Sequence, residues 1–234
     1  MKISVVIPAW NEAETIADAV ASARAIGDEV IVVDAGSPDG TAERATSAGA
    51  RVVASEKGRG HQLRAGAERA SGDVLLFLHA DVRLEGDARS AIARALEHPA
   101  AVAGNFFLRF EGATFAAWLF TVANDVRRRL LRIYYGDSAI FVRASTYVAL
   151  GGFRAMPLFE DYDFVRRLER LGPTAYVRDV VAVASARRFE HAPLRTLLLW
   201  SLLQVLFSIG VSPARLARLY VDARPKPRAP RRGR

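Results

Sequence analysis

Cysteine is absent from the 234-residue sequence, and lysine is rare, since Lys2, Lys57 and Lys226 are the three lysines among 33 basic residues. A chain without thiols forms no disulfide scaffold, thiolate zinc site or cysteine nucleophile, and it suits a reducing compartment. Apolar residues make up 51% and charged residues 25%, so the chain is neither mainly disordered nor of low complexity. This length and composition predict one large domain with a full core.

Long apolar runs are lacking too. The run Ile3–Ile7 is too short for the core of a secretory signal and is soon followed by Asn11 and Glu12. The most apolar segment, Thr196–Ser212, contains no charged residue. It is nevertheless shorter than the roughly 20 residues that a membrane-spanning helix needs.

Four polar residues recur every three or four positions in this segment: Ser201, Gln204, Ser208 and Ser212. In a helix they share one face and leave a wide apolar face opposite. Such a helix lies in a membrane interface, contacts a second copy in a homodimer, or packs into the core. A membrane span is the interpretation that its length favours least.

Positive charge is concentrated at the C-terminal end. Ala214–Arg234 contains eight basic residues and one acid, which accounts for most of the formal net charge of +8. Basic residues next to an apolar helix are attracted to anionic lipid, and a solvated tail without a partner is the alternative. Residues 223–234 are rich in arginine and proline and are predicted to be disordered.

The first hundred residues alternate β-branched runs with helical patterns. Strands are predicted at 3–9, 28–37, 50–55 and 72–82, and helices at 11–26, with Asn11 as N-cap, and at 40–49 and 60–71. This alternation predicts an α/β fold with a doubly wound, mostly parallel sheet flanked by helices. Ligands bind beyond the carboxyl ends of such strands. We therefore expect Pro8–Glu12, Asp34–Asp39 and His79–Asp81 to meet in one crevice.

The second half is less regular. Strands are predicted at 101–110, 138–146 and 174–185, and helices at 115–135 and 160–172. The first of these helices contains Trp118 and Phe120, which line the ligand side or belong to the core. The second helix begins with acids and ends at a glycine, in keeping with the helix dipole.

Four motifs, in this order along the chain, resemble family 2 glycosyltransferases of the GT-A fold: "VVIPAWNE", "VVDAGSPDGT", "LLFLHADV" and "FEDYDFVRRL". The likeness is greatest to a short bacterial subgroup with a His-Ala-Asp metal motif and a "YGDSAIF" segment. It implies a GT-A domain over about 1–190, with a nucleotide-binding half to about residue 100 and an acceptor half beyond it. An apolar helical segment at 191–222 follows. Such enzymes move a sugar from a nucleotide donor to an acceptor with inversion and need a divalent cation, Mn²⁺ or Mg²⁺.

The resemblance implies a metal ligand at Asp81. A carboxylate at a strand end suits Mg²⁺ or Mn²⁺, which prefer oxygen ligands, and a capping aspartate is the alternative. His79 stands where the family commonly has an acid. His79 could be a metal ligand, a phosphate contact or a residue that shapes the loop, and the sequence does not decide among these roles.

Donor contacts are implied at Pro8, Glu12 and Asp34, where a carboxylate beyond a strand can bind a base N–H or a ribose hydroxyl. Asp39 lies in "SPDG", a strong turn signal, and is expected to form the turn. Family members often have a second acid where Ala35 stands. The identity of the donor's nucleotide base is therefore not decided, and a UDP-sugar is favoured over a GDP-sugar.

Further donor contacts are implied at Arg59 and Gln62, in "EKGRGHQL", where glycines let the backbone approach an anion. Arg188, in "SARRFEHA", is expected to hold the diphosphate because a guanidinium matches phosphate geometry. A surface pair is the alternative for Arg188.

Catalysis is expected at Asp161, since an inverting transfer needs a base that takes the proton of the acceptor hydroxyl. Glu160 is expected to support it or to contact the acceptor. Asp163 is expected to be a helix-start charge.

The leading interpretation is therefore a cytoplasmic, metal-dependent inverting glycosyltransferase, with a peripheral contact to the inner face of a membrane through 196–212 and the basic tail. The acceptor is open, and a lipid-linked or hydrophobic one is favoured. The alternatives are a non-catalytic nucleotide-sugar or membrane-binding module, and a sugar-phosphate nucleotidyltransferase, which usually has a Gly-rich loop where "PAWNEAET" stands. Nucleic acid is not expected as a partner, because the body has no basic stripe with interleaved aromatics.

Overall fold

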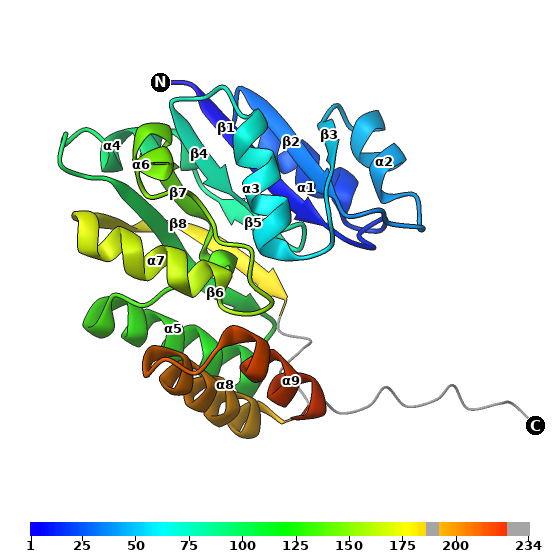
Figure 1. The fold of residues 1–234 in the computed structure, drawn as a ribbon. Helices are drawn as coiled ribbons and strands as arrows, with labels where there is room; N and C mark the ends of the chain where they lie inside the picture. Colours follow the sequence, from blue (N-terminus) through cyan, green and yellow to red (C-terminus); the bar gives the residue numbers. More distant parts are fainter. Residues whose placement is uncertain (186–191, 224–234) are drawn as a thin grey trace, which may run out of the picture.

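The computed structural model describes residues 1–185 and 192–223, and shows one sheet flanked by helices (Figure 1). The sheet has eight strands in the order β3-β2-β1-β4-β7-β6-β8-β5. The strands are β1 (Ile3–Ala9), β2 (Glu29–Asp34), β3 (Arg51–Ala54), β4 (Val74–Phe77), β5 (Val82–Glu85), β6 (Ala103–Glu111), β7 (Ile140–Arg143) and β8 (Thr174–Ser185). The helices are α1 (Ile16–Arg24), α2 (Thr41–Ser47), α3 (Arg59–Arg69), α4 (Ala88–Ala95), α5 (Phe115–Leu131), α6 (Ala144–Ala149), α7 (Glu160–Leu171), α8 (Pro193–Ser208) and α9 (Pro213–Ala223), with a 3-10 turn η1 (Gly136–Ser138).

Most strands of the sheet run in one direction. β1 to β4 are mutually parallel, β6 and β8 share their direction, and β7 and β5 run opposite to it. The predicted doubly wound, mostly parallel sheet is confirmed. The carboxyl ends of β1, β2 and β4 consequently lie at the same edge.

Both faces of the sheet are buried. Along β1, Ile3, Val5 and Ile7 enter one core cluster, and Val6 enters the other. Side chains of α1, α4 and α5 cover the first face, and those of α3 and α7 cover the second. A strand buried on both faces has a continuous apolar run rather than an alternating one, which is why the sequence predicted these strands.

Three local predictions were wrong. The predicted strand 138–146 is a strand only over β7, because η1 and α6 occupy its two ends. The first helix begins at Ile16 with Thr15 as its cap, whereas Asn11 has a left-handed backbone (φ 57°). Asn11 turns the chain there, a conformation that asparagine tolerates better than most residues. The predicted strand 72–82 divides into β4 and β5, because the chain turns between them and β5 pairs with β8 at the far edge of the sheet.

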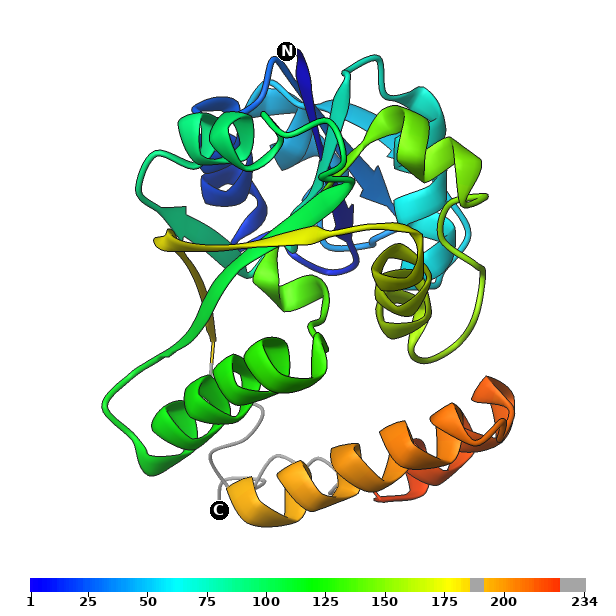
Figure 2. The same cartoon turned by 90° about the vertical axis from the view of Figure 1, so that its left-hand side faces the viewer.

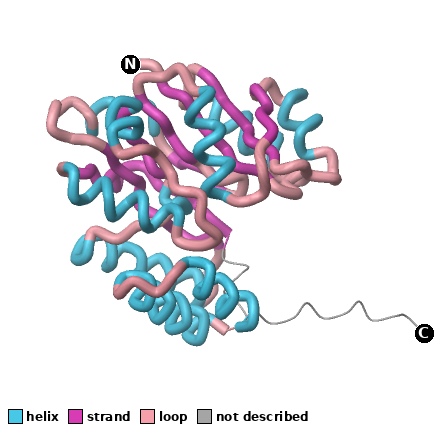
Figure 3. The backbone as a smooth tube through the Cα atoms, in the orientation of Figure 1, coloured by secondary structure: helices cyan, strands magenta, loops and turns pink. Residues whose placement is uncertain are grey.

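Helices α8 and α9 form an outer layer below α5 (Figure 3). Leu203 of α8 and Leu216 of α9 are buried against Ile133, Phe159 and Tyr162. Within the described residues, no helix is both long enough and apolar enough to cross a membrane.

The polar residues of α8 face the protein. Ser201 Oγ accepts a hydrogen bond from Arg127 Nη2 (2.6 Å), and Ser208 Oγ lies 3.1 Å from the Tyr162 hydroxyl. Gln204 Oε1 accepts from the Tyr135 hydroxyl. The sequence correctly predicted a polar stripe on this helix, but that stripe binds the protein. The apolar residues of α8 divide between an inner side, where Leu203 is buried, and an exposed side, which includes Leu198 and Leu202.

Candidate active site

The loops after β1 and β2 are joined at the carboxyl edge of the sheet. The Asn11 N–H donates to Ser37 Oγ (2.9 Å), and the Ala13 N–H donates to Asp39 Oδ2 (3.1 Å). Asp39 also accepts from the Thr41 hydroxyl, which lowers the pKa of its carboxyl group. Asp39 thus forms the turn that the sequence predicted.

Asp34 lies at the end of β2, with 6% of its surface exposed. Its Oδ2 accepts from the N–H groups of Gly36 and Ser37 (both 2.9 Å), and its Oδ1 accepts from Ser37 Oγ (2.5 Å). These hydrogen bonds organise its own loop. A donor contact by Asp34 stays a prediction.

Two further predicted donor residues lie at the same edge. Pro8 pairs with Val33 near the ends of β1 and β2. The Gln62 amide, on α3, donates to the carbonyl oxygens of Ala9 (2.7 Å) and Val33 (3.0 Å). Gln62 therefore bridges the last residues of two strands, and its own contact with a nucleotide stays a prediction.

Glu12 begins the turn before α1. Its carboxylate accepts from Thr15 Oγ1 (2.9 Å), and its N–H donates to Thr41 Oγ1 (2.9 Å). Close by in sequence, Trp10 carries the Lys57 ammonium 3.7 Å from its ring centroid, a cation–π contact. Sequence reasoning missed Trp10, and its place inside the first motif was the available signal.

Two carboxylates begin α7. Glu160 and Asp161 are 5% and 8% exposed, and the N-terminus of a helix favours negative charge. Asp161 Oδ2 accepts from the Gly136 N–H (2.9 Å), and its Oδ1 accepts from the Tyr162 N–H (2.7 Å). Phe159, just before them, has a left-handed backbone (φ 66°), and such strain in a bulky residue concentrates at functional sites.

The segment after α5 brings a third acid to this place. Asp137 Oδ1 lies 2.9 Å from His79 Nδ1, and His79 is largely buried. A β-carbon on Gly136 would lie 2.6 Å from His79 Nε2. The "YGDSAIF" segment thus places its glycine against His79 and its aspartate on the ring nitrogen, roles that the sequence did not assign.

Arg59, the first residue of α3, ties these acids together. Its Nε lies 3.3 Å from Glu160 Oε1, and its side chain is 41% exposed. Burial alone would lower the pKa of its guanidinium, but the carboxylates of Glu160, Asp161, Asp137 and Asp81 raise it above the usual value. Acids from three separate segments therefore surround one cation.

The surroundings of Glu160 disfavour its charged form. Burial, and then the neighbouring charge of Asp161, raise the pKa of its carboxyl group, and Arg59 only partly offsets them. A pair of acids in which one is held by peptide N–H groups and the other is desolvated is typical of acid–base sites.

These residues border a cavity of about 320 Å³ between α7 and the α8–α9 layer. Its polar side holds the acids and Arg59, and its other side is aromatic and aliphatic. The lining residues are Gly58, Arg59, Tyr135, Asp137, Met156, Pro157, Leu158, Phe159, Glu160, Asp161, Trp200, Leu203, Ala217 and Tyr220.

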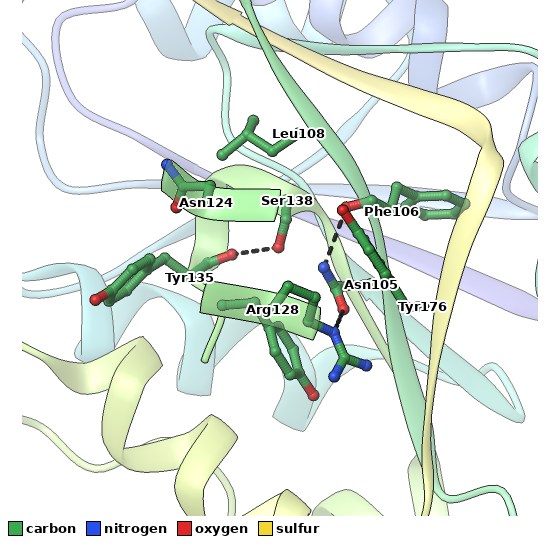
Figure 4. A pocket seen from close by; sticks show the side chains of 9 residues that line it. Asn105, Phe106, Leu108, Asn124, Arg128, Tyr135, Ser138 and Tyr176 are labelled. Carbon is green, nitrogen blue, oxygen red and sulfur yellow. Dashed lines mark hydrogen bonds between the residues drawn. The ribbon is translucent and has the colours of Figure 1, made fainter. Parts of the chain in front are cut away.

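A second polar cluster supports the segment that carries Asp137 (Figure 4). Ser138 Oγ donates to the Tyr135 carbonyl (2.7 Å), and Arg128 Nε donates to Asn105 Oδ1 (2.6 Å). Arg128 is 6% exposed and also binds the carbonyl oxygens of Thr174 and Ala175. This cluster joins α5 to β6 and β8 directly behind η1.

No group of three or more His, Cys, Asp or Glu side chains that could hold a metal alone occurs among the described residues. Mg²⁺ usually keeps one or two carboxylates and completes its shell with substrate phosphates and water. Asp81 is exposed between β4 and β5, close enough for its charge to raise the pKa of the Arg59 guanidinium, and it supplies the hard oxygen such an ion prefers. The donor set fits an ion that arrives with a diphosphate.

Comparison with known proteins identifies the family. The model of "Glycosyl transferase family 2" matches residues 4–156. The chain belongs to this family. Glucosyl-3-phosphoglycerate synthase of Mycobacterium tuberculosis is 39% identical over 93 residues, a match that covers 34% of this chain and 29% of that enzyme's length. Dolichol-phosphate mannosyltransferase of Pyrococcus furiosus is 32% identical over 93 residues, covering 36% and 26%.

A solved structure is similar in fold over more of the chain than the family model covers. The mycobacterial synthase in complex with Mn²⁺, UDP and phosphoglyceric acid superposes with a TM-score of 0.60 at 23% identity, over 90% of this chain and 79% of that one. Another complex of that enzyme contains Mg²⁺ and UDP. The GT-A fold expected from the motifs is confirmed, and the divalent cations expected for this chain are those found with the relative.

Most of the expected site lies together. Asp161, Glu160 and Arg59 share the cavity, and His79 reaches it through Asp137. Pro8, Glu12, Asp34 and Gln62 lie at the ends of β1 and β2 and are not among the residues that line this cavity. Arg188 lies outside the described residues.

Proposed function

We propose that this protein transfers a glycosyl group from a UDP-sugar to an acceptor hydroxyl, with inversion at the anomeric carbon. The observation that carries the proposal is the Asp161 carboxylate. Two peptide N–H groups hold it at the start of α7, beside Glu160 and open to a cavity large enough for an acceptor. A base so fixed can receive a proton without rearranging.

In the proposed reaction, Asp161 takes the proton of the acceptor hydroxyl while the oxygen of that hydroxyl attacks the anomeric carbon. The bond from that carbon to the diphosphate oxygen breaks, and its electron pair leaves with the nucleotide. Glu160 and Arg59 position the acceptor side, and Asp81 holds the donor side. A bound Mn²⁺ or Mg²⁺ supplies the positive charge that stabilises the leaving diphosphate.

The acceptor, we infer, carries an apolar portion next to its reactive hydroxyl. Trp200, Leu203 and Tyr220 line the cavity opposite the acids. Among the described residues that line the cavity, Arg59 is the one cation, and it already faces Glu160. This lining suits a hydrophobic or lipid-linked acceptor better than a small phosphorylated acid such as the one bound by the mycobacterial relative.

Donor binding is tested by thermal shift with UDP, GDP, CDP, dTDP and ADP, each with and without Mn²⁺. We expect UDP with Mn²⁺ to stabilise the wild type and Asp161→Asn, but not Asp81→Asn, because a ligand stabilises only the state that binds it. Asp179→Asn is the control, since that carboxylate pairs with Arg94 outside the site. A folded protein that shifts with none of these nucleotides would refute the donor site.

Turnover is tested by NMR with UDP-sugars and alkyl or lipid-linked acceptors. Asp161→Asn should slow transfer by about 10²- to 10⁴-fold while donor binding persists, and the product should show the inverted anomer. Donor binding without turnover in either protein would favour the non-catalytic binding module. A sugar-1-phosphate product would favour the nucleotidyltransferase.

A further inference from the structure

Exposed apolar side chains are concentrated in one region of the molecule. Apart from Met1, Val148 and Leu171, every exposed large apolar side chain in residues 1–185 and 192–220 lies on α5, on α9, or on α8 and the residue after it. A globular protein scatters such residues singly, and a contiguous group marks an interaction surface.

Ten of these side chains form two rows at helical spacing, which we call the apolar face. The row on α5 is Phe115, Trp118, Val122, Val126 and Leu130, and the row along α8 is Leu194, Leu198, Leu202, Val205 and Ile209. Exposure runs from 40% at Val122 to 76% at Leu130. Spacings of three and four residues place each row on one side of its helix.

The two helices lie side by side, as both ribbon views show (Figures 1 and 2). Arg127 of α5 donates to Ser201 of α8 between them. Each helix buries its opposite side, with Phe120 in the main core and Leu203 in the outer cluster. Both rows therefore point away from the body of the protein.

The charge of the C-terminal part of the sequence favours one kind of partner. Residues 193–234 contain nine basic residues and one acid, Asp222, which equals the chain's whole net charge of +8. Arg195, Arg215 and Arg218 are exposed on α8 and α9. A second copy would bring the same positive charge to the contact, whereas an anionic surface would neutralise it.

We propose that the apolar face docks on an anionic lipid bilayer. Its side chains enter the interface, and the exposed basic residues of α8 and α9 bind lipid headgroups. The proposal concerns binding alone and does not depend on the transfer reaction.

Docking would place the candidate active site next to the lipid. Trp200 and Leu203 line the cavity, while Leu198 and Leu202 of the same helix belong to the apolar face. One helix thus separates the cavity from the proposed bilayer surface.

Sedimentation of the full chain with sucrose-loaded vesicles tests this. We expect pelleting with vesicles that contain phosphatidylglycerol, weaker pelleting with phosphatidylcholine alone, and release as salt is raised. Leu198→Ser combined with Leu202→Ser should weaken binding about tenfold or more. Arg215→Gln combined with Arg218→Gln should weaken it roughly tenfold on the anionic vesicles alone.

Leu171→Ser is the matched control, because that leucine is 51% exposed on α7 and lies outside the apolar face. Circular dichroism checks that each variant is folded. Equal binding to both vesicle types, no binding to either, or an unchanged affinity of the leucine variant would overturn the proposal. So would a dimer, detected by analytical ultracentrifugation, that the leucine variant abolishes, because the face would then be a contact between copies.

Discussion

Adjacent carboxylates of the same helix turn meet different surroundings at the start of α7. Asp161 accepts hydrogen bonds from two peptide N–H groups, and Glu160 is buried beside the Arg59 guanidinium. Peptide N–H groups stabilise a carboxylate, and burial destabilises one. The pair can therefore divide proton transfer and positioning between two side chains of the same chemistry.

The raised pKa of Glu160 predicts how stability depends on pH. The pKa of Glu160 is higher in the folded chain than its ordinary value of 4.5, so the folded state binds the proton more tightly than the unfolded state. The protein therefore loses stability as pH rises above that value. Glu160→Gln removes the buried charge. We expect the variant to melt at a higher temperature than the wild type at pH 7 and at the same temperature near pH 4.

Calorimetry from about pH 4 to pH 8 measures this difference. Glu56→Gln is the control, since its side chain is 84% exposed. A lower melting temperature for Glu160→Gln at pH 7 would mean that the attraction to Arg59 outweighs the cost of burial.

The sequence marked Asp161, Glu160 and Arg59 as candidate site residues but did not predict that they would meet. The structure brings them together because each stands at the start of a helix, α7 or α3. The sequence also did not predict that Asp34 and Gln62 would form their hydrogen bonds with backbone groups of the protein. The same atoms can serve a ligand or a turn, and a motif does not distinguish the two. Asp137 was missed because its role depends on His79, 58 positions earlier in the chain.

At the scale of elements, α5 is anchored by a buried cation. Arg128 binds Asn105 and Thr174 and lies 3.5 Å from Glu169. Removing one member of a buried pair leaves the other charge unpaired, which costs about 3–5 kcal/mol. We expect Arg128→Met to lower the free energy of unfolding by about that amount, as measured by urea denaturation.

The double variant Arg128→Met/Glu169→Leu distinguishes charge from packing. Apolar replacement of both partners is often neutral or stabilising, so the double variant should recover most of the loss. Arg129→Met, at an exposed position on the same helix, is the control. A double variant as unstable as the single one would assign the effect to the other hydrogen bonds of Arg128.

Elements with a strong period were predictable, and irregular ones were not. Continuous apolar runs predicted the buried strands, and the acidic start of "EDYDFVRRLERLG" predicted α7. The short β5 and the turn η1 escaped, since each has only three or four residues and is defined by a distant partner. For α8 the sequence predicted the polar stripe but not that the protein would bind it, nor that apolar residues would lie on both the buried and the exposed side.

At the scale of the whole molecule, the predicted nucleotide and acceptor halves share one sheet. β4 pairs with β7 and β5 pairs with β8, so strands of each half bond to strands of the other. We expect one cooperative unfolding transition. Tryptophan fluorescence and far-ultraviolet circular dichroism should give the same midpoint in urea.

Two separate midpoints would show that the halves unfold independently although they share one sheet.

The order of the strands in the sheet could not be predicted from the sequence. Hydrophobic periodicity predicts where a strand lies but not which neighbour it pairs with, and β5 crosses to the far edge of the sheet.

The β5–β8 ladder also restricts how parts of this family can be exchanged. A recombination boundary near residue 100 would separate Val82 from its partner Ala184 and force foreign strands into register. A boundary between Ser185 and Pro193 cuts no strand of the sheet. The α8–α9 wall can therefore be exchanged as one piece, so chimaeras could be built with a new cavity wall on an unchanged sheet.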